Sequence, residues 1–401
     1  MIDRAIKKDK DCSGCFACVN ICPVNCITME TDAEGFKYPL VDYDKCKECG
    51  KCIKACPIIN KKELKREIKA YACINKNEAI RKESSSGGVF TLIAESIIEQ
   101  GGVVFGAAFD DNFALKHSYV ETKKDLAKFR GSKYLQSEVG MTFKKAKEFL
   151  ENERAVFFTG TPCQIAGLKS YLGKDYAKLF CADIVCHGVP SPEVFKEYLD
   201  FSEKKLKTKI KKISFRDKSR GWHSYSVLMK LENKKEYCES SSENLYLKAF
   251  LNNVCLRPSC YNCNFKGLNR ASDITLADFW GIEKILPKMD DNKGVSLIFV
   301  NSLEGKNKMN KLKSKLICEE VELDKALKRN ISAVRSAKLK SKRRKFMKDF
   351  KKLSFDELVK KHCKEKRSRI IRKKAKKLVL ESLVKFGLIK AKKVKKIKKI
   401  K

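Results

Sequence analysis

The feature that most constrains this chain is a cysteine run that occurs twice near its N-terminus. The first run is Cys12, Cys15, Cys18 and Cys22-Pro23, and the second is Cys46, Cys49, Cys52 and Cys56-Pro57. Three thiolates within seven residues can cap three irons of one cubane, whereas zinc sites favour separated Cys pairs and often use histidine. The chain has only 4 His. The two runs therefore predict two 4Fe-4S clusters rather than zinc sites.

The spacing of both runs is that of a bacterial dicluster ferredoxin, in which the cysteine before proline ligates the other cluster. We therefore expect a ferredoxin-like dicluster domain over residues 1–60. Cys26 lies outside both runs and is expected to be a small core residue. One cluster is predicted on Cys12, Cys15, Cys18 and Cys56, and the second on Cys46, Cys49, Cys52 and Cys22.

The chain of 401 residues contains 19 Cys, starts without an apolar leader and has no apolar run of membrane-spanning length. We therefore expect a cytoplasmic protein whose thiols are reduced and used for metal binding. The formal net charge of +39 is uneven, because residues 334–401 hold 30 basic and 5 acidic side chains. This distribution predicts a helical, Lys-rich tail over 336–401.

Apolar residues recur at near-helical spacing among the lysines of residues 370–401, which leaves three interpretations of the tail. An amphipathic helix can lie on an anionic membrane surface, and a basic helix can dock to an acidic partner. A solvated Lys-rich helix has the same composition. Nucleic acid is not expected as a partner.

Beyond a charged, helical linker at 61–69, strands and helices alternate, which predicts a mixed α/β domain over 70–335. Buried strands are expected at 103–109, 155–160 and 179–185. A helix is expected after the turn Ser84-Ser85-Ser86-Gly87-Gly88. Such a turn can present backbone N–H groups to a phosphate or a flavin, although it also suits an ordinary loop-to-helix connection.

Four cysteines outside the ferredoxin runs form a second candidate site. Cys163 and Cys186 lie at or just beyond the carboxyl ends of predicted strands, where open α/β sheets bind ligands. Cys260 and Cys263 form a CxxC pair further along the chain. Four thiolates match the ligand count of a third 4Fe-4S cluster, but the spacing fits a zinc site or buried thiols equally well.

Several short motifs accompany these cysteines and resemble those of one known family. Over residues 1–335 the chain resembles the family of coenzyme F420 hydrogenase/dehydrogenase beta subunits, in the form with an N-terminal dicluster ferredoxin. Besides the ferredoxin runs, the motifs are Ser86-Gly87-Gly88-Val89, Gly131-Ser132-Lys133-Tyr134, Gly160-Thr161-Pro162-Cys163-Gln164, the segment 186–192, Phe215-Arg216-Asp217-Lys218, the segment 257–263 and the segment 273–281.

The resemblance implies a flavoprotein with FAD in the α/β domain and a further 4Fe-4S cluster beside it. It favours Ser86, Gly87, Gly88 and Lys133 as FAD contacts. It also favours the cluster over the zinc interpretation for the four cysteines of the second candidate site. The ligands of this third cluster would be Cys163, Cys186, Cys260 and Cys263.

We therefore expect an oxidoreductase that passes electrons between a hydride carrier, such as reduced coenzyme F420, and a ferredoxin or other redox partner protein. A flavin belongs between them, because it exchanges both hydride and single electrons, whereas clusters carry one electron each. Two alternatives remain. One is a non-catalytic electron-transfer subunit of a larger complex, and the other is a ferredoxin-fed reductase of a biosynthetic intermediate such as a glycan or pigment precursor. The motifs identify no catalytic residue.

Overall fold

The computed structural model describes residues 1–7, 10–61 and 66–364 and divides the chain into two compact units. The first unit comprises residues 1–196 and 256–339, and the second comprises residues 197–255 and the chain from 340 onwards. Both units are therefore built from segments that are far apart in the sequence. The described residues contain no helix that is long and apolar enough to cross a membrane.

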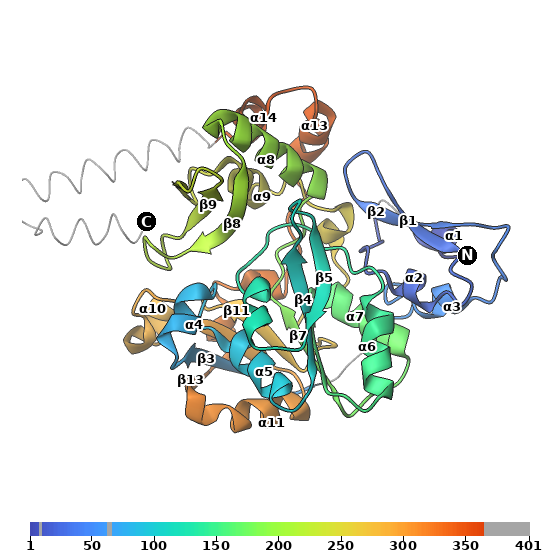
Figure 1. The fold of residues 1–401 in the computed structure, drawn as a ribbon, viewed down its shortest axis with the longest axis horizontal. Coiled ribbons are helices and arrows are strands. Elements are labelled where there is room, and N and C mark those ends of the chain that lie inside the picture. Colours follow the sequence, from blue (N-terminus) through green and yellow to red (C-terminus); the bar gives the residue numbers. More distant parts are fainter. Residues whose placement is uncertain (8–9, 62–65, 365–401) are drawn as a thin grey trace, which may run out of the picture. The chain divides into compact units, whose positions relative to one another are not determined.

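The first unit is built on an eight-stranded mixed sheet (Figure 1). Its strand order is β13-β3-β12-β11-β7-β6-β4-β5, in which β4, β6, β7 and β11 run parallel and the outer pairs are antiparallel. The strands are β3 (Lys69–Asn75), β4 (Val103–Phe109), β5 (Leu115–Val120), β6 (Val156–Gly160), β7 (Leu179–Ile184), β11 (Ile274–Asp278), β12 (Ser296–Val300) and β13 (Leu316–Val321).

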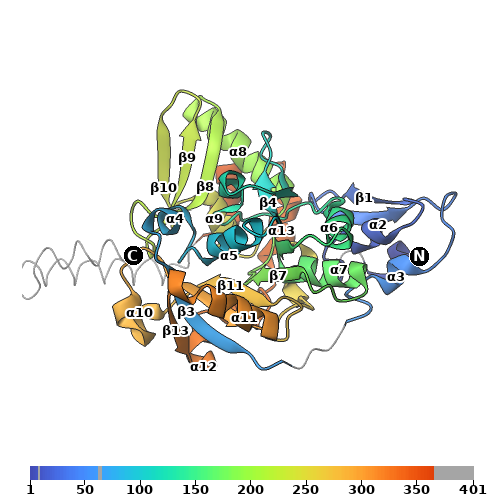
Figure 2. The same ribbon diagram turned by 60° about the horizontal axis from the view of Figure 1, so that its bottom comes forward.

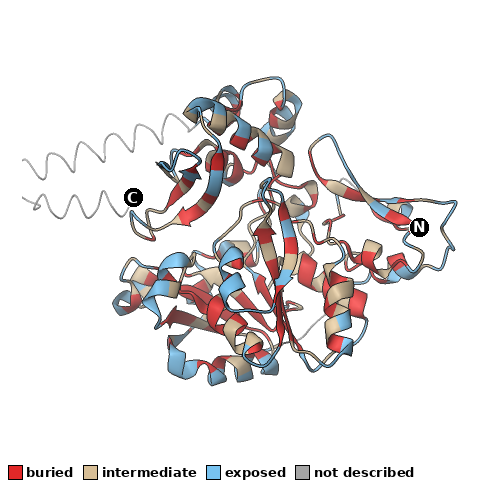
Figure 3. Cartoon of the chain, in the orientation of Figure 1, coloured by how far each residue is buried: buried red, intermediate tan, exposed pale blue. Residues whose placement is uncertain are grey.

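Helices cover both faces of this sheet, because successive strand residues point to opposite sides and both sides are apolar. Val104 and Phe157 contribute to the core on one face, beneath α5 (Val89–Ile98) and α11 (Leu303–Lys311). The alternate residues of the same strands face α6 (Thr142–Glu151) and α7 (Pro162–Leu172) on the other side (Figure 2). Figure 3 shows the strands buried between helices whose outer faces are exposed.

The N-terminal cysteine domain packs into the second of these cores. Phe16 and Ala17 are buried among the same residues as Phe143 of α6 and Ile165 of α7. The buried Asn20 side chain donates to the Gly140 carbonyl at 2.8 Å. The elements of this domain are α1 (Ile2–Ala5), α2 (Ala17–Ile21), α3 (Lys51–Lys54) and the antiparallel hairpin β1 (Ile27–Thr31) and β2 (Lys37–Val41).

The second unit contains a three-stranded antiparallel sheet and helices from both of its segments. Its core includes the stacked rings of Tyr198 and Tyr246, with Phe355 against Tyr198. The helix α8 (Pro192–Leu206) carries the chain into it. Its other elements are β8 (Ile210–Asp217), β9 (Ser226–Leu231), β10 (Glu236–Ser240), α9 (Leu245–Leu251), α13 (Lys342–Asp349) and α14 (Phe355–His362).

Short helical segments complete the first unit. They lie in the connections between the longer elements of the chain. They are α4 (Glu78–Glu83), α10 (Ile282–Ile285), α12 (Leu323–Leu327) and the 3-10 turns η1 (Lys124–Phe129), η2 (Pro258–Asn262), η3 (Pro287–Met289), η4 (Lys313–Lys315) and η5 (Ile331–Ala333).

The predicted α/β class is confirmed, and strands β4, β6 and β7 lie where the apolar runs placed them. The helix expected at 61–69 is wrong for the described part of that segment, since residues 66–68 have no regular structure and β3 begins at Lys69. The Arg66 guanidinium instead donates to the Ser272 and Asn301 carbonyls. Residues 62–65, and the tail from 365 onwards with its membrane-surface interpretation, lie outside the described residues.

One pair of cysteines departs from the expectation that the thiols are reduced. Cys73 of β3 and Cys318 of β13 are direct cross-strand partners and form a disulfide. The sequence contained no signal for this pair, because the two residues are 245 positions apart and become neighbours only when β13 pairs with β3.

Replacing Phe16 by Ala is expected to lower the free energy of unfolding by about 3 kcal/mol, because it empties a core position shared by α2, α6 and α7. Thermal unfolding of the reconstituted full chain measures the change. Ile59→Ala, at a position 40% exposed in the same domain, is the matched control and should change stability by less than about 1 kcal/mol. Equal effects of the two substitutions would contradict this account of the docking.

Candidate iron–sulfur and flavin site

The first predicted set of cysteines surrounds one hollow. Cys12, Cys15, Cys18 and Cys56 line an open hollow of about 350 Å³, together with apolar residues that include Ile58. The four side chains come from both cysteine runs, as the dicluster pattern predicts. Because Cys56 belongs to the second run, the fold must bring the end of that run next to the first run.

The remaining four predicted ligands surround a separate hollow of about 320 Å³. Its lining includes Cys22, Cys46, Cys49 and Cys52. Cys26 is buried, as expected, but it also lines this hollow, and its Sγ lies 3.4 Å from that of Cys22. Cys49 is exposed, so this second hollow reaches the protein surface.

The four predicted cluster ligands of the α/β domain also come together, around a hollow of about 530 Å³. Cys163 lies in the first turn of α7, and Cys186 follows β7. Cys260 and Cys263 belong to η2 and the position after it. The cap of α7 confirms the predicted helix start, since Thr161 and Gln164 form a capping box with Pro162 as the first residue.

Burial makes these thiols poor acids without a bound cation. It raises the pKa of Cys260 to about 12 and raises that of Cys163 well above its usual value, with repulsion from the other three thiols adding to the effect on Cys163. Burial likewise raises the pKa of Cys15 to about 12 in the first hollow. Thiolates in such sites need bound cations to neutralise them, and iron in a thiolate-ligated cluster meets that need.

In the parts of the chain that the structure describes, no three His, Cys, Asp or Glu side chains are grouped to hold a single metal ion. The third hollow is lined by four thiols, those of Cys163, Cys186, Cys260 and Cys263. This donor set fits a cluster of several iron ions with four thiolate ligands.

Two cations border the third hollow. The Lys266 ammonium donates to the carbonyls of Cys186 and Ser332. The Arg270 guanidinium forms a buried ion pair with Asp183 at 3.3 Å and also donates to the Ile184 carbonyl. Positive charge next to four thiols stabilises their ionised form and any negative charge added to a cluster there.

The first and third hollows share part of their walls. Ser13 and Ile58 of the cysteine domain line both of them. Helix α7 links the two as well, because Gly167 packs on Cys15. A Cβ on Gly167 would lie 3.1 Å from the Cys15 Sγ. The helix that carries Cys163 in its first turn therefore reaches the first set of cysteines one turn later.

The turn predicted to contact FAD is held by the sheet. A Cβ on Gly87 would lie 2.3 Å from the Cys73 carbonyl oxygen, and the Gly87 N–H donates to the Ser296 hydroxyl. The Ser86 hydroxyl also bonds to Ser296, at 2.9 Å. Packing therefore explains the glycine at 87, and its amide is already bonded within the protein.

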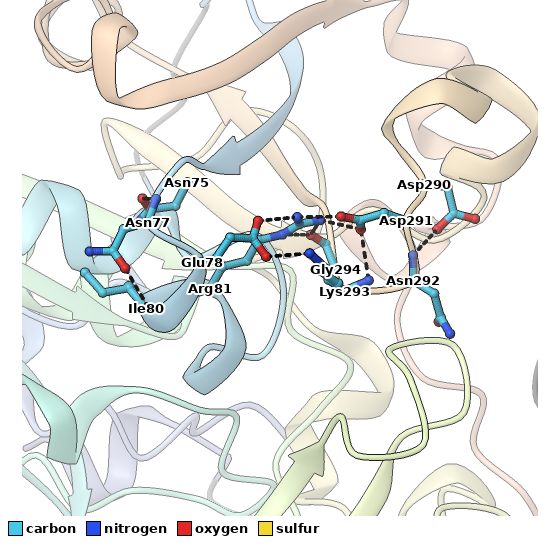
Figure 4. A network of polar contacts seen from close by, with 10 residues as sticks. All are labelled: Asn75, Asn77, Glu78, Ile80, Arg81, Asp290, Asp291, Asn292, Lys293 and Gly294. Carbon is cyan, nitrogen blue, oxygen red and sulfur yellow. Dashed lines mark hydrogen bonds and ion pairs between the residues drawn. The ribbon is translucent and has the colours of Figure 1, made fainter.

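A polar network braces the same turn from α4 (Figure 4). The buried Arg81 guanidinium forms two hydrogen bonds with the Asp291 carboxylate, at 2.6 and 2.7 Å, and also donates to the Gly294 carbonyl. Gly294 in turn abuts Ser86, since a Cβ there would lie 2.9 Å from the Ser86 carbonyl. Asn75 donates to the Gly88 carbonyl at 3.1 Å. The turn is thus a rigid platform at the N-terminus of α5.

Lys133 lies near this platform. Its ammonium donates to the carbonyls of Phe129, Arg130 and Gly131 at 3.1–3.2 Å, and the preceding Ser132 bonds to Ser85. Hydroxyl groups, an ammonium and a helix N-terminus make a donor set that suits an anionic cofactor tail. The structure therefore brings the serines of the turn together with the Gly131–Tyr134 motif, which are separated in the sequence.

His117 is a residue near this region that the sequence analysis did not single out. It lies on β5, and its Nε2 bonds to the Thr159 carbonyl at the end of β6. The described residues offer no hydrogen-bond partner for its buried Nδ1. Burial, with a smaller contribution from Lys133, lowers the pKa of His117 to about 4. Its inward position in the alternating β5 strand was the available signal.

A neutral buried His117 makes stability depend on pH. Its pKa is about 4 in the folded chain and about 6.5 when unfolded, so the unfolded state gains the proton first as pH falls. Its contribution is present above pH 6.5 and is lost at about 1.4 kcal/mol per pH unit as pH falls towards 4. Urea unfolding at pH 7.5 and 5.5 should show a smaller pH effect in His117→Gln than in the unmodified chain. The same pH effect in both proteins would contradict the contribution assigned to His117.

Comparison with known families agrees with this geometry. Residues 11–58 match the family model for a 4Fe-4S dicluster domain. Residues 70–144 and 153–326 match the models for the N-terminal and C-terminal parts of the coenzyme F420 hydrogenase/dehydrogenase beta subunit. Together the two beta-subunit models match more than half of the chain.

Individual relatives are more distant. The chain is 30% identical over 196 residues to an uncharacterized protein of Methanocaldococcus jannaschii, covering 41% of this chain and 53% of that protein. It is 26% identical over 166 residues to one subunit of the F(420)H(2) dehydrogenase of Methanosarcina mazei, covering 38% and 46%. The matches thus span about half the length of these curated relatives.

A chain of the F420-reducing [NiFe] hydrogenase complex from Methanosarcina barkeri aligns with a TM-score of 0.46 and 18% identity, over 67% of this chain and 90% of that one. The assignment of a family therefore rests on the family models and on the cysteine geometry. On these grounds the chain belongs to the family of coenzyme F420 hydrogenase/dehydrogenase beta subunits and carries an N-terminal 4Fe-4S dicluster domain.

Proposed function

We propose that this chain is an iron–sulfur flavoprotein oxidoreductase. It exchanges electrons between a two-electron hydride carrier, with reduced coenzyme F420 as the first candidate, and a ferredoxin or similar one-electron partner. The observation that supports it most is the convergence of Cys163, Cys186, Cys260 and Cys263 around a hollow that shares walls with the first ferredoxin hollow. Electrons can pass directly between redox centres in adjacent hollows, so the transfer takes place within the protein.

The three hollows suggest an order for the centres. The third hollow lies next to the first through Ser13 and Ile58, and the second hollow contains the exposed Cys49. In this proposal the α/β domain exchanges electrons with the cluster on the first set of cysteines. The cluster nearest the surface then exchanges them with the partner protein. The direction of flow follows from the potentials of the carrier and the partner.

FAD, when bound, would supply the exchange between hydride and single electrons that clusters cannot perform. We place its anionic tail at Ser86, Gly88 and Lys133, with the hydroxyls of Ser85 and Ser132 beside them. Gly87 would act by letting the turn pack on β3 and β12. The name of the Methanosarcina mazei relative supports F420 as the hydride carrier, and its description as a subunit supports a partner protein.

The second candidate function is a non-catalytic electron-transfer subunit. One observation favours it: the Gly87 amide and the Lys133 ammonium, two of the predicted FAD contacts, are already bonded to groups of the protein itself. In that case the chain would hold clusters but no flavin, and the hydride chemistry would belong to another subunit.

Cys163→Ser is expected to remove one cluster, because it deletes a ligand of the third hollow. After anaerobic reconstitution the unmodified chain should hold about twelve irons and the variant about eight, with a matching loss of sulfide. Cys238→Ser is the control, at a half-buried cysteine of β10 that lines none of the three hollows, and it should retain about twelve. An unchanged iron content in Cys163→Ser would contradict the third cluster.

Flavin content and reactivity test the function as a whole. The reconstituted chain should release about one FAD per molecule on denaturation. Reduced F420 should bleach the bound flavin under anaerobic conditions, and NADH serves as the comparison donor. Eight irons without flavin would instead support the electron-transfer subunit. Bound flavin that reduced F420 fails to reduce would move the proposal to another two-electron substrate.

A further inference from the structure

A buried arginine lies between the cysteine domain and the α/β domain. Arg257 is completely buried, and its Nε donates to the Cys12 carbonyl at 2.8 Å. One terminal nitrogen donates to the Lys37 carbonyl at 2.9 Å and lies 3.7 Å from the Cys12 Sγ. The other donates to the Gln136 side chain at 3.0 Å, and the guanidinium lies 4.3 Å from the centre of the Tyr38 ring.

The positive charge of Arg257 has no carboxylate among its direct contacts in the described residues. Asp32 interacts electrostatically with this charge, but burial has the larger effect and raises the pKa of Asp32. Its Oδ1 accepts hydrogen bonds from the N–H groups of Glu34 and Phe36. A guanidinium stays protonated in proteins, and a buried charge without an opposite charge is costly. An anion next to Arg257 would therefore stabilise the site, and a thiolate-ligated cluster beside Cys12 would provide that negative charge.

The first cysteine loop is shaped around this arginine. Gly14, between Cys12 and Cys15, has a φ of +66°, and a Cβ there would lie 2.9 Å from an Arg257 terminal nitrogen. The equivalent position of the second run is Glu48, which is exposed. The second hollow is bordered by Lys47 and Lys51, and both are exposed, so water and salt screen them. The second hollow therefore serves as the reference for the first, because it has the same cysteine spacing without a buried arginine among the described residues that line it.

The same residue is tied to the third hollow through its backbone. The Arg257 N–H donates to the Val189 carbonyl at 2.9 Å, and its carbonyl accepts from the Cys260 N–H at 3.0 Å. The guanidinium in the first cluster site is thus anchored by the segment that carries ligands of the third site.

We propose that Arg257 is the counter-charge of the cluster on Cys12, Cys15, Cys18 and Cys56 and raises its reduction potential relative to the second cluster. This inference rests on the cluster assignment in the proposed function. Reduction adds one negative charge to a cluster, and a fixed cation in a buried site favours that step. The first cluster then accepts electrons more readily than its sequence twin.

The test is an anaerobic redox titration of the reconstituted full chain with dithionite and mediators, followed by electron paramagnetic resonance. Arg257→Gln removes the charge and keeps a donor, whereas Arg257→Lys keeps the charge and loses the planar fork. Arg154→Gln, at a partly exposed arginine paired with Glu121, is the control. Iron and sulfide are counted on every sample.

In Arg257→Gln we expect the equilibrium constant for reduction of one ferredoxin-type cluster to fall about tenfold or more. For one electron a tenfold fall is about 59 mV. The other ferredoxin-type cluster should not change. In Arg257→Lys this equilibrium constant should stay within about threefold of its value in the unmodified chain. In Arg154→Gln it should equal the value in the unmodified chain. Loss of one cluster's iron in Arg257→Gln alone would also support the counter-charge.

Three results would overturn the proposal and leave Arg257 a packing role. They are equal shifts of the reduction potential in Arg257→Gln and Arg257→Lys, no shift in either variant, and loss of iron from both. The titration requires neither flavin nor F420. An unmodified chain without flavin or without a third cluster would therefore contradict the proposed function while the test of Arg257 still gives its answer.

Discussion

The packing of the first cysteine loop against helix α7 is the contact on which the candidate site depends. Gly167 lacks the side chain that would separate α7 from Cys15, and Phe16 enters the core between α6 and α7. Cys163 lies four residues before Gly167 on the same helix, a rise of about 6 Å. Because a helix is stiff, this contact holds the third hollow next to the first.

Charge balance is the second constraint, since buried thiols resist ionisation until cations lie beside them. Lys266 and Arg270 border the third hollow, and Arg257 reaches the first. Arg270 has a carboxylate partner in Asp183, whereas Arg257 bonds to carbonyl oxygens and one sulfur. The protein thus places fixed positive charge where a cluster would carry negative charge, which is one of the means by which proteins set cluster potentials.

Local patterns predicted much of the fold and of the site. The apolar runs located β4, β6 and β7, and Thr161-Pro162 located the start of α7. The antiparallel strands β12 and β13 were not anticipated, because their partner β3 is more than 200 residues away in the sequence. His117 was missed although the alternation of β5 was a signal, and its contact with the Thr159 carbonyl of β6 joins residues 42 positions apart.

The two cysteine runs and the predicted exchange of their fourth ligands follow from local spacing, because a cluster needs its thiols at close spacing and a short segment supplies most of them. Local spacing could not decide whether Cys163, Cys186, Cys260 and Cys263 form one site. Only the tertiary structure joined them, by bringing the ends of β6 and β7 to η2. Likewise, only the folded chain placed Arg257 beside Cys12, 245 residues away, because a long-range contact follows from packing and leaves no local pattern.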